Sequence, residues 1–134
     1  MAQIEWQSGY DTGIEAIDSQ HREIVTLINR LEVATHGSDH AEVTEILRRI
    51  QDYVTNHFSY EESLLEQAGF KFAESHVRTH HRFTQRLDSL QQRFDAGGYV
   101  TKELLNFLQR WLISHIAHED QMYVSVVKKT LNEV

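Results

Sequence analysis

Hydrophobic residues recur at alternating spacings of three and four along most of the chain, which is the period of an amphipathic α-helix. The pattern predicts four helices, at about residues 18–36, 40–68, 72–95 and 101–131. On each helix the apolar stripe also contains at least one histidine, at a position where leucine or isoleucine is expected. The sequence therefore predicts a helical protein with unusual polar residues on its inward faces.

Short segments containing glycine connect the predicted helices. Gly37 and Gly69 follow the first two helices, and we expect Gly37 to end its helix in the left-handed conformation. Because short connections make neighbouring helices antiparallel, the expected fold is an all-α, up-down-up-down four-helix bundle. Residues 1–17 lack the helical pattern and form an expected N-terminal arm.

The composition agrees with one helical domain spanning residues 1–134. The chain has no proline, only six glycines and 40% hydrophobic residues, so long helices and a sizeable core are both allowed. Cysteine is absent, which excludes disulfides and thiolate metal sites and fits a reducing compartment. We therefore expect a cytoplasmic protein.

Charge and hydropathy argue against two classes of partner. The formal net charge of −7 is unfavourable for binding nucleic acid, which requires a basic face. No stretch approaches the roughly 18 apolar residues that a membrane span needs. The N-terminal residues also lack the charged and apolar regions of a signal peptide.

The informative feature is the placement of several of the nine histidines. Buried polar groups are costly unless they are paired or bind something, so inward histidines on all four helices indicate a shared site. The polar residues on the predicted inward stripes are His21, His57, Glu61, His76, His80 and His115. Two pairs among them have i, i+4 spacing, which places both members on one helix face.

The positions of these residues along the helices show that they can meet. His21 and His57 lie about 17 and 19 residues from the turn near residue 38, and His80 and His115 each lie about 17 residues from the turn at residues 97–98. At a rise of ~1.5 Å per residue, all four are roughly 26 Å from the same end of the bundle. Four helices therefore bring candidate ligands to one level.

The ligand types narrow the choice of metal. Five imidazoles and at least one carboxylate exceed the needs of a single tetrahedral zinc, and calcium or magnesium would prefer oxygen ligands. Imidazole together with carboxylate suits iron, zinc, copper or nickel, and the number of ligands favours two ions.

Four motifs in this order resemble the signature of the hemerythrin family, and the resemblance covers essentially the whole chain. The motifs are Ile17-Asp-Ser-Gln-His21, His57-Phe-Ser-Tyr-Glu61, His76-Val-Arg-Thr-His80 and His115-Ile-Ala-His-Glu-Asp120. The resemblance implies a non-enzymatic protein that binds dioxygen reversibly at a non-haem diiron site, as an oxygen carrier, store or delivery protein.

The same resemblance implies how the two irons are held. Glu61, Asp120 and an oxo or hydroxo group would bridge the two ions. His76, His80 and His115 would bind one iron, and His21 and His57 would bind the other. One coordination position, on the iron with two histidines, would stay open for a small ligand.

Asp120 does not fit the helical spacing. Five residues of regular helix would place it about 140° around the axis from His115. A π-bulge or a helix break near residues 117–120 would bring Asp120 inward. Without such an irregularity, the spacing alone would favour Glu119 or His118.

Apolar residues within about one turn of the candidate ligands are similar to the family's oxygen pocket, although ordinary core packing would also explain them. They are Ile24, Phe58, Trp111, Leu112 and Ile116. Tyr123, one turn beyond Asp120, is either a hydrogen-bond partner of a bridging carboxylate or a plain buried tyrosine.

Two other functions use the same kind of site. A diiron enzyme acting on oxygen, peroxide or nitric oxide is one alternative, but the Glu-x-x-His pairs of ferritin-like enzymes do not occur in the sequence. An oxygen sensor or an iron-handling domain is the other. The sequence indicates dioxygen as the ligand and identifies no protein partner.

Overall fold

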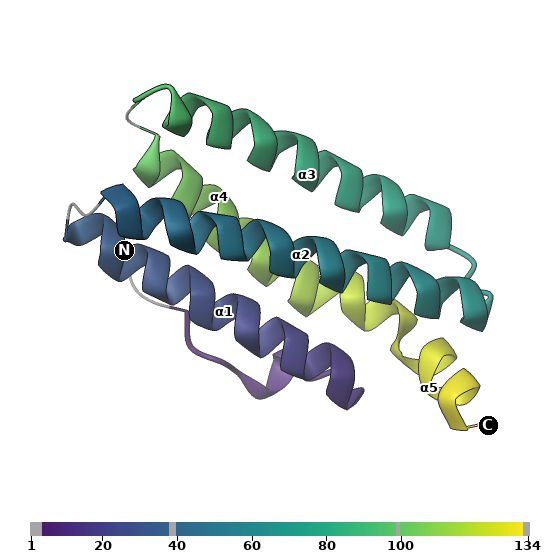
Figure 1. Ribbon diagram of the computed structural model, residues 1–134. Helices are drawn as coiled ribbons and strands as arrows, with labels where there is room; N and C mark the ends of the chain where they lie inside the picture. The colour runs from purple at the N-terminus through teal and green to yellow at the C-terminus, as the bar shows by residue number, and fades with distance from the viewer. Residues whose placement is uncertain (1–3, 38–39, 99, 133–134) are drawn as a thin grey trace.

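The computed structural model describes residues 4–37, 40–98 and 100–132. Four long helices run antiparallel to their neighbours, and a short fifth helix follows at the C-terminal end (Figure 1). The helices are α1 (Glu15–His36), α2 (His40–Ala68), α3 (Ala73–Asp95), α4 (Thr101–Ser114) and α5 (Val124–Asn132). The described residues contain no strand, and the predicted all-α bundle is confirmed.

Glycine in the left-handed conformation ends two of these helices. Gly69 follows α2 with φ 63°, and the next N–H, that of Phe70, donates to the Leu65 carbonyl at 3.0 Å. Gly97 follows α3 with φ 88°. The lack of a Cβ makes this conformation inexpensive, so both chain reversals are sharp.

The expectation that Gly37 adopts the left-handed conformation is wrong. Its φ is −80°, and its N–H donates to the Val33 carbonyl at 3.2 Å. Helical hydrogen bonding therefore continues through Gly37.

Helix α1 begins at Glu15 rather than at the predicted Asp18, so the arm is shorter than expected. The Asp18 carboxylate is turned back toward the arm, where it accepts the N–H and the hydroxyl of Thr12 at 2.9 and 2.7 Å. Its second oxygen accepts the Gly13 N–H at 3.0 Å. Asp18, which lies in the first turn of α1, therefore holds residues 12 and 13 of the arm against the start of the helix.

The arm is tied to α1 by side-chain hydrogen bonds to its backbone. Asn29 accepts the Ile4 N–H at 2.8 Å and donates to the Ile4 carbonyl at 2.9 Å. In Figure 1 the arm runs beside α1 as the purple segment. Further along the arm, the rings of Trp6 and Tyr10 pack edge to face with centroids 5.5 Å apart.

The predicted fourth helix, residues 101–131, is interrupted close to the possible break expected near residues 117–120. Helix α4 is followed by a π-helical turn, η2 (His115–Glu119), and by a 3-10 turn, η3 (Asp120–Tyr123), before α5 begins. This interruption lies where the sequence places His115 and Asp120.

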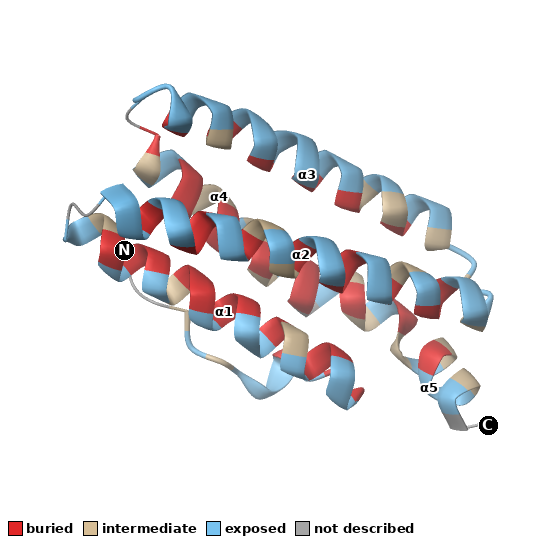
Figure 2. Cartoon of the chain, viewed as in Figure 1, coloured by how far each residue is buried: buried red, intermediate tan, exposed pale blue. Residues whose placement is uncertain are grey.

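Buried residues line the inward faces of all the long helices (Figure 2). They form two apolar clusters: a large one that includes Ile24, Val54, Phe83 and Leu112, and a smaller one that includes Ile14, Ile17, Leu64, Leu65, Tyr123 and Val127. Along the chain, the predicted metal ligands lie near the point where members of the larger cluster end and those of the smaller cluster begin. The site is therefore a polar layer closed on both sides by apolar packing.

A transmembrane role finds no support in the helices. None within the described ranges is both long enough and apolar enough to cross a bilayer.

Candidate metal centre

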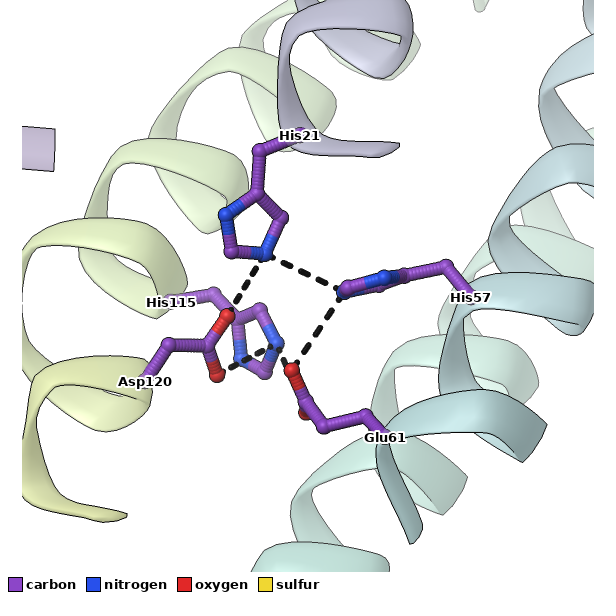
Figure 3. Close-up of side chains that lie close together, drawn as sticks. All are labelled: His21, His57, Glu61, His115 and Asp120. Atoms are coloured by element: carbon purple, nitrogen blue, oxygen red, sulfur yellow. Dashed lines mark hydrogen bonds and ion pairs between the residues drawn. The ribbon is translucent and has the colours of Figure 1, made fainter. Parts of the chain in front are cut away.

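The structure brings all seven predicted ligands into one buried cluster. Five of them are drawn in Figure 3, where side chains from α1, α2 and the α4–η3 segment converge. None of the seven is more than 7% exposed. The cluster consists of His21, His57, Glu61, His76, His80, His115 and Asp120.

The two oxygens of Glu61 contact different histidines. Oε1 is hydrogen-bonded to His76 Nε2 and lies 2.9 Å from His80 Nε2 and 3.5 Å from His115 Nε2. Oε2 lies 3.4 Å from His57 Nε2. One carboxylate from α2 thus reaches histidines on three helices.

Asp120 divides its contacts in the same way. Its Oδ1 lies 3.3 Å from His76 Nε2 and 3.0 Å from His115 Nε2. Its Oδ2 lies 2.7 Å from His21 Nε2, and His21 Nε2 is in turn 3.2 Å from His57 Nε2.

The cluster therefore has two parts, a three-histidine side (His76, His80 and His115) and a two-histidine side (His21 and His57). Each carboxylate directs one oxygen to each side. That is the arrangement expected of carboxylates that bridge two ions.

The π-helical turn η2 explains how Asp120 enters the cluster. A π-helical turn contains more residues than a regular turn, so it changes which later residue faces inward. As a result Asp120 is fully buried, whereas His118 is exposed and Glu119 is only partly buried. The two residues that regular spacing favoured do not contribute an atom to the cluster.

Three partners of the histidines escaped the sequence analysis. In each case the ring nitrogen that faces away from the cluster hydrogen-bonds to a side chain: His57 Nδ1 to Gln20 at 2.7 Å, His80 Nδ1 to Glu62 at 3.0 Å, and His115 Nδ1 to Glu119 at 3.1 Å. Only the i, i+4 spacing of His115 and Glu119 was available as a sequence signal. The other two pairs join different helices.

The cluster fits a metal because several of its inward atoms have no hydrogen-bond partner. A neutral imidazole that donates through Nδ1 presents a lone pair at Nε2 to a metal, and the Nε2 atoms of this cluster lie beside the carboxylates. His80 Nε2, His115 Nε2 and both Asp120 oxygens are buried without a hydrogen bond. Such groups are costly in a core unless a cation binds them, and this mixture of imidazole and carboxylate suits iron.

Without metal, the negative charges of the two carboxylates and the positive charges of protonated imidazoles stabilise one another. Burial alone would raise the pKa of the Glu61 and Asp120 carboxyls, but the neighbouring imidazoles, above all His115, lower both pKa values. Burial alone would lower the pKa of His76, but the adjacent Asp120 and Glu61 raise it to about 9, and they raise that of His115 as well. Burial dominates at His57, whose pKa falls to about 4.

Comparison with known proteins agrees with this geometry. Residues 12–127 match the Hemerythrin HHE cation binding domain. The chain belongs to the hemerythrin family. Members of this family hold a diiron centre, and the buried cluster supplies the ligand types that such a centre needs.

Similarity to individual proteins extends over nearly the full length. The chain is 40% identical to bacteriohemerythrin from Pseudomonas aeruginosa (strain LESB58), over all of this chain and 88% of that protein. It is 41% identical to bacteriohemerythrin from Stenotrophomonas maltophilia (strain R551-3), over 99% of this chain and 87% of the relative. A crystal structure of wild-type hemerythrin superimposes with a TM-score of 0.88 at 26% identity, covering 94% of this chain and 98% of that one.

Within this hemerythrin domain, Tyr123 contacts the cluster directly. Its hydroxyl donates to Glu61 Oε2 at 2.9 Å. Burial and the Glu61 charge raise the pKa of Tyr123, so the hydroxyl keeps its proton and remains a donor. Tyr123 thereby fixes the carboxylate oxygen that faces the two-histidine side.

The five predicted pocket residues belong to the larger apolar group or, for Trp111, pack against it, and two of them contact ligand histidines. Phe58 stacks on His80 with ring centroids 3.7 Å apart, and Trp111 stacks on His115 at 4.5 Å. Ile24, Leu112 and Ile116 are each at most 2% exposed. Aromatic and aliphatic side chains therefore cover one side of the polar layer.

Replacing the carboxylate that serves both sides should remove both ions. Glu61→Ala is expected to reduce the iron content from about two per chain to less than about one, since even outer hydrogen-bond partners of ligands are typically worth about 10–100-fold in metal affinity. Metal analysis after anaerobic iron loading measures this directly. The exposed Glu66→Ala, on the same helix, is the control and should retain both irons. Full iron content in Glu61→Ala would contradict the ligand assignment.

Iron uptake should release protons. At pH 7 the raised pKa values keep His76 and His115 protonated in the metal-free protein, and both must lose their protons to bind metal. We expect about two protons per site, and a metal affinity that falls as the pH drops below about 9, the pKa of His76. Calorimetry in two buffers of different ionisation enthalpy counts the protons. A binding enthalpy that does not depend on the buffer would contradict proton release. The variant His118→Ala, at an exposed position, is the control and should release as many protons as the unmodified protein.

Proposed function

We propose that this protein binds dioxygen reversibly at a diiron centre and serves as an oxygen carrier, store or delivery protein. Glu61 and Asp120 would bridge the two irons. His76, His80 and His115 would complete one iron's protein ligands, and His21 and His57 would complete those of the other. Bound there, the iron pair supplies the electrons and the coordination position for dioxygen.

The observation that carries the proposal is the unequal number of donors on the two sides. The three-histidine side offers three imidazole nitrogens and two carboxylate oxygens. The two-histidine side offers two imidazole nitrogens and two carboxylate oxygens. Two ions of the same coordination number would therefore differ by one free position, on the side of His21 and His57. This arrangement suits one small ligand.

The surroundings favour reversible binding over consumption of oxygen. Apolar clusters close the polar layer above and below, so water has little access to the free position. Tyr123 is the one hydroxyl recorded on the ligand carboxylates, and it is engaged with Glu61. Because its pKa is raised, Tyr123 is a poor proton source for a ligand bound on the two-histidine side. An enzyme that reduces oxygen would need an effective proton source.

The deciding experiment follows the visible spectrum of the reduced, iron-loaded protein. We expect an absorption band that appears when oxygen is admitted to the anaerobically reduced protein. The band should disappear when oxygen is removed, and this should repeat over several cycles. The zinc-loaded protein is the control, because zinc occupies the same kinds of ligand and has no redox chemistry. Continuous consumption of oxygen with an added reductant, and release of product at each cycle, would instead support the enzyme alternative.

Leu112→Ala tests the apolar wall of the free position. Its side chain is 1% exposed and lies one turn before His115, so truncation should admit water and speed irreversible oxidation while leaving the iron content nearly unchanged. The loss of packing should lower the free energy of unfolding by about 2–5 kcal/mol. Rates of oxidation in air and thermal unfolding are measured together.

Leu108→Ala is the matched control for this variant. Leu108 lies one turn earlier on α4 and is also 1% exposed. Its replacement should therefore lower the free energy of unfolding by a similar amount without changing the oxidation rate. Equal oxidation rates in the two folded variants would remove Leu112 from the pocket.

A further inference from the structure

The outward hydrogen bonds of the histidines differ between the two sides of the cluster. On the three-histidine side, His80 and His115 donate to the carboxylates of Glu62 and Glu119, at 3.0 and 3.1 Å. On the two-histidine side, His57 donates to the neutral amide oxygen of Gln20, at 2.7 Å.

The remaining ligand on the two-histidine side also lacks a carboxylate partner. His21 is fully buried, and its Nδ1 makes no hydrogen bond. Among the described residues, carboxylates that accept a ligand histidine's outward Nδ1 proton therefore occur only on the three-histidine side.

This difference has an electronic consequence for any bound metal. A carboxylate that accepts the Nδ1 proton increases the basicity of the imidazole, and a more basic ligand stabilises the more highly charged metal ion. An amide oxygen fixes the same tautomer and ring orientation without adding charge. The hydrogen bond from His57 to Gln20 is short, so the difference lies in the charge of the acceptor and not in the quality of the contact.

We propose that Gln20 is a positioning residue of the oxygen site. Its amide oxygen holds His57 with Nδ1 protonated and Nε2 directed at the two-histidine side, and its neutrality limits electron donation there. Gln20 thereby protects the ferrous state of the ion with the free position against irreversible oxidation. This role rests on the proposed oxygen-binding function, because only that function requires the ferrous state to persist in air.

Two variants separate orientation from charge. Gln20→Glu keeps the shape and an acceptor but adds a negative charge, so it should retain iron, lower the reduction potential and raise the rate of oxidation in air about tenfold, within the range seen for outer partners of ligands. Gln20→Leu removes the acceptor and should weaken metal retention by about 10–100-fold. Ser19→Glu, an exposed neighbour on α1, adds the same charge without contacting His57 and should behave like the unmodified protein.

A readout independent of oxygen tests the hydrogen bond itself. Nitrogen NMR of the zinc-loaded protein should show His57 protonated at Nδ1 with a slowly exchanging proton, retained in Gln20→Glu and lost in Gln20→Leu. A Gln20→Glu potential equal to that of Ser19→Glu would overturn the proposal, as would an unchanged His57 signal in Gln20→Leu. If the unmodified protein failed to bind oxygen reversibly, only the oxygen function would fall, since the NMR and potential measurements would still report on Gln20.

Discussion

The structure depends on one electrostatic constraint. Seven inward polar side chains share a layer of the core, and they carry too few protons for every acceptor atom to receive a hydrogen bond. His80 Nε2, His115 Nε2 and both oxygens of Asp120 have no hydrogen bond although they are buried. When the imidazoles are neutral, such lone pairs repel one another in a medium of low dielectric constant, and a bound cation makes the interaction attractive. Protons on His76 and His115 compensate part of this charge in the metal-free chain.

The apolar packing makes this constraint stricter. Because one hydrophobic cluster lies on each side of the layer, little water is available to replace a missing ligand partner. The same closure explains the interruption of the C-terminal helix. A regular helix after His115 would bury Glu119 or His118 instead of Asp120, and the π-helical turn η2 is the local change of backbone that avoids this.

The sequence was sufficient to predict the features that follow from the helical period of its hydrophobic residues. The bundle and the level at which His21, His57, His80 and His115 meet follow from spacing and helix rise alone. Asp120 needed the family resemblance, because no periodicity predicts a π-helical turn. The early start of α1 and the right-handed Gly37 depend on hydrogen bonds within the folded chain, such as those of Asp18 to the arm, and stripe patterns carry no information about them.

The sequence also did not predict Gln20 and Glu62 as partners of the histidines, because each forms its hydrogen bond with a histidine of another helix. Both residues stand next to a ligand of their own helix. Successive residues of a helix point about 100° apart, so a residue next to an inward ligand faces the seam with an adjacent helix. There the outward nitrogen of another helix's histidine is within reach, as Gln20 beside His21 reaches His57 and Glu62 beside Glu61 reaches His80. Helices α1 and α2 therefore each supply ligands of their own and also orient a ligand of the next helix. The acceptor at each seam can then change its charge without moving the ligand, which allows the two sides of one centre to differ electronically within a nearly symmetric bundle.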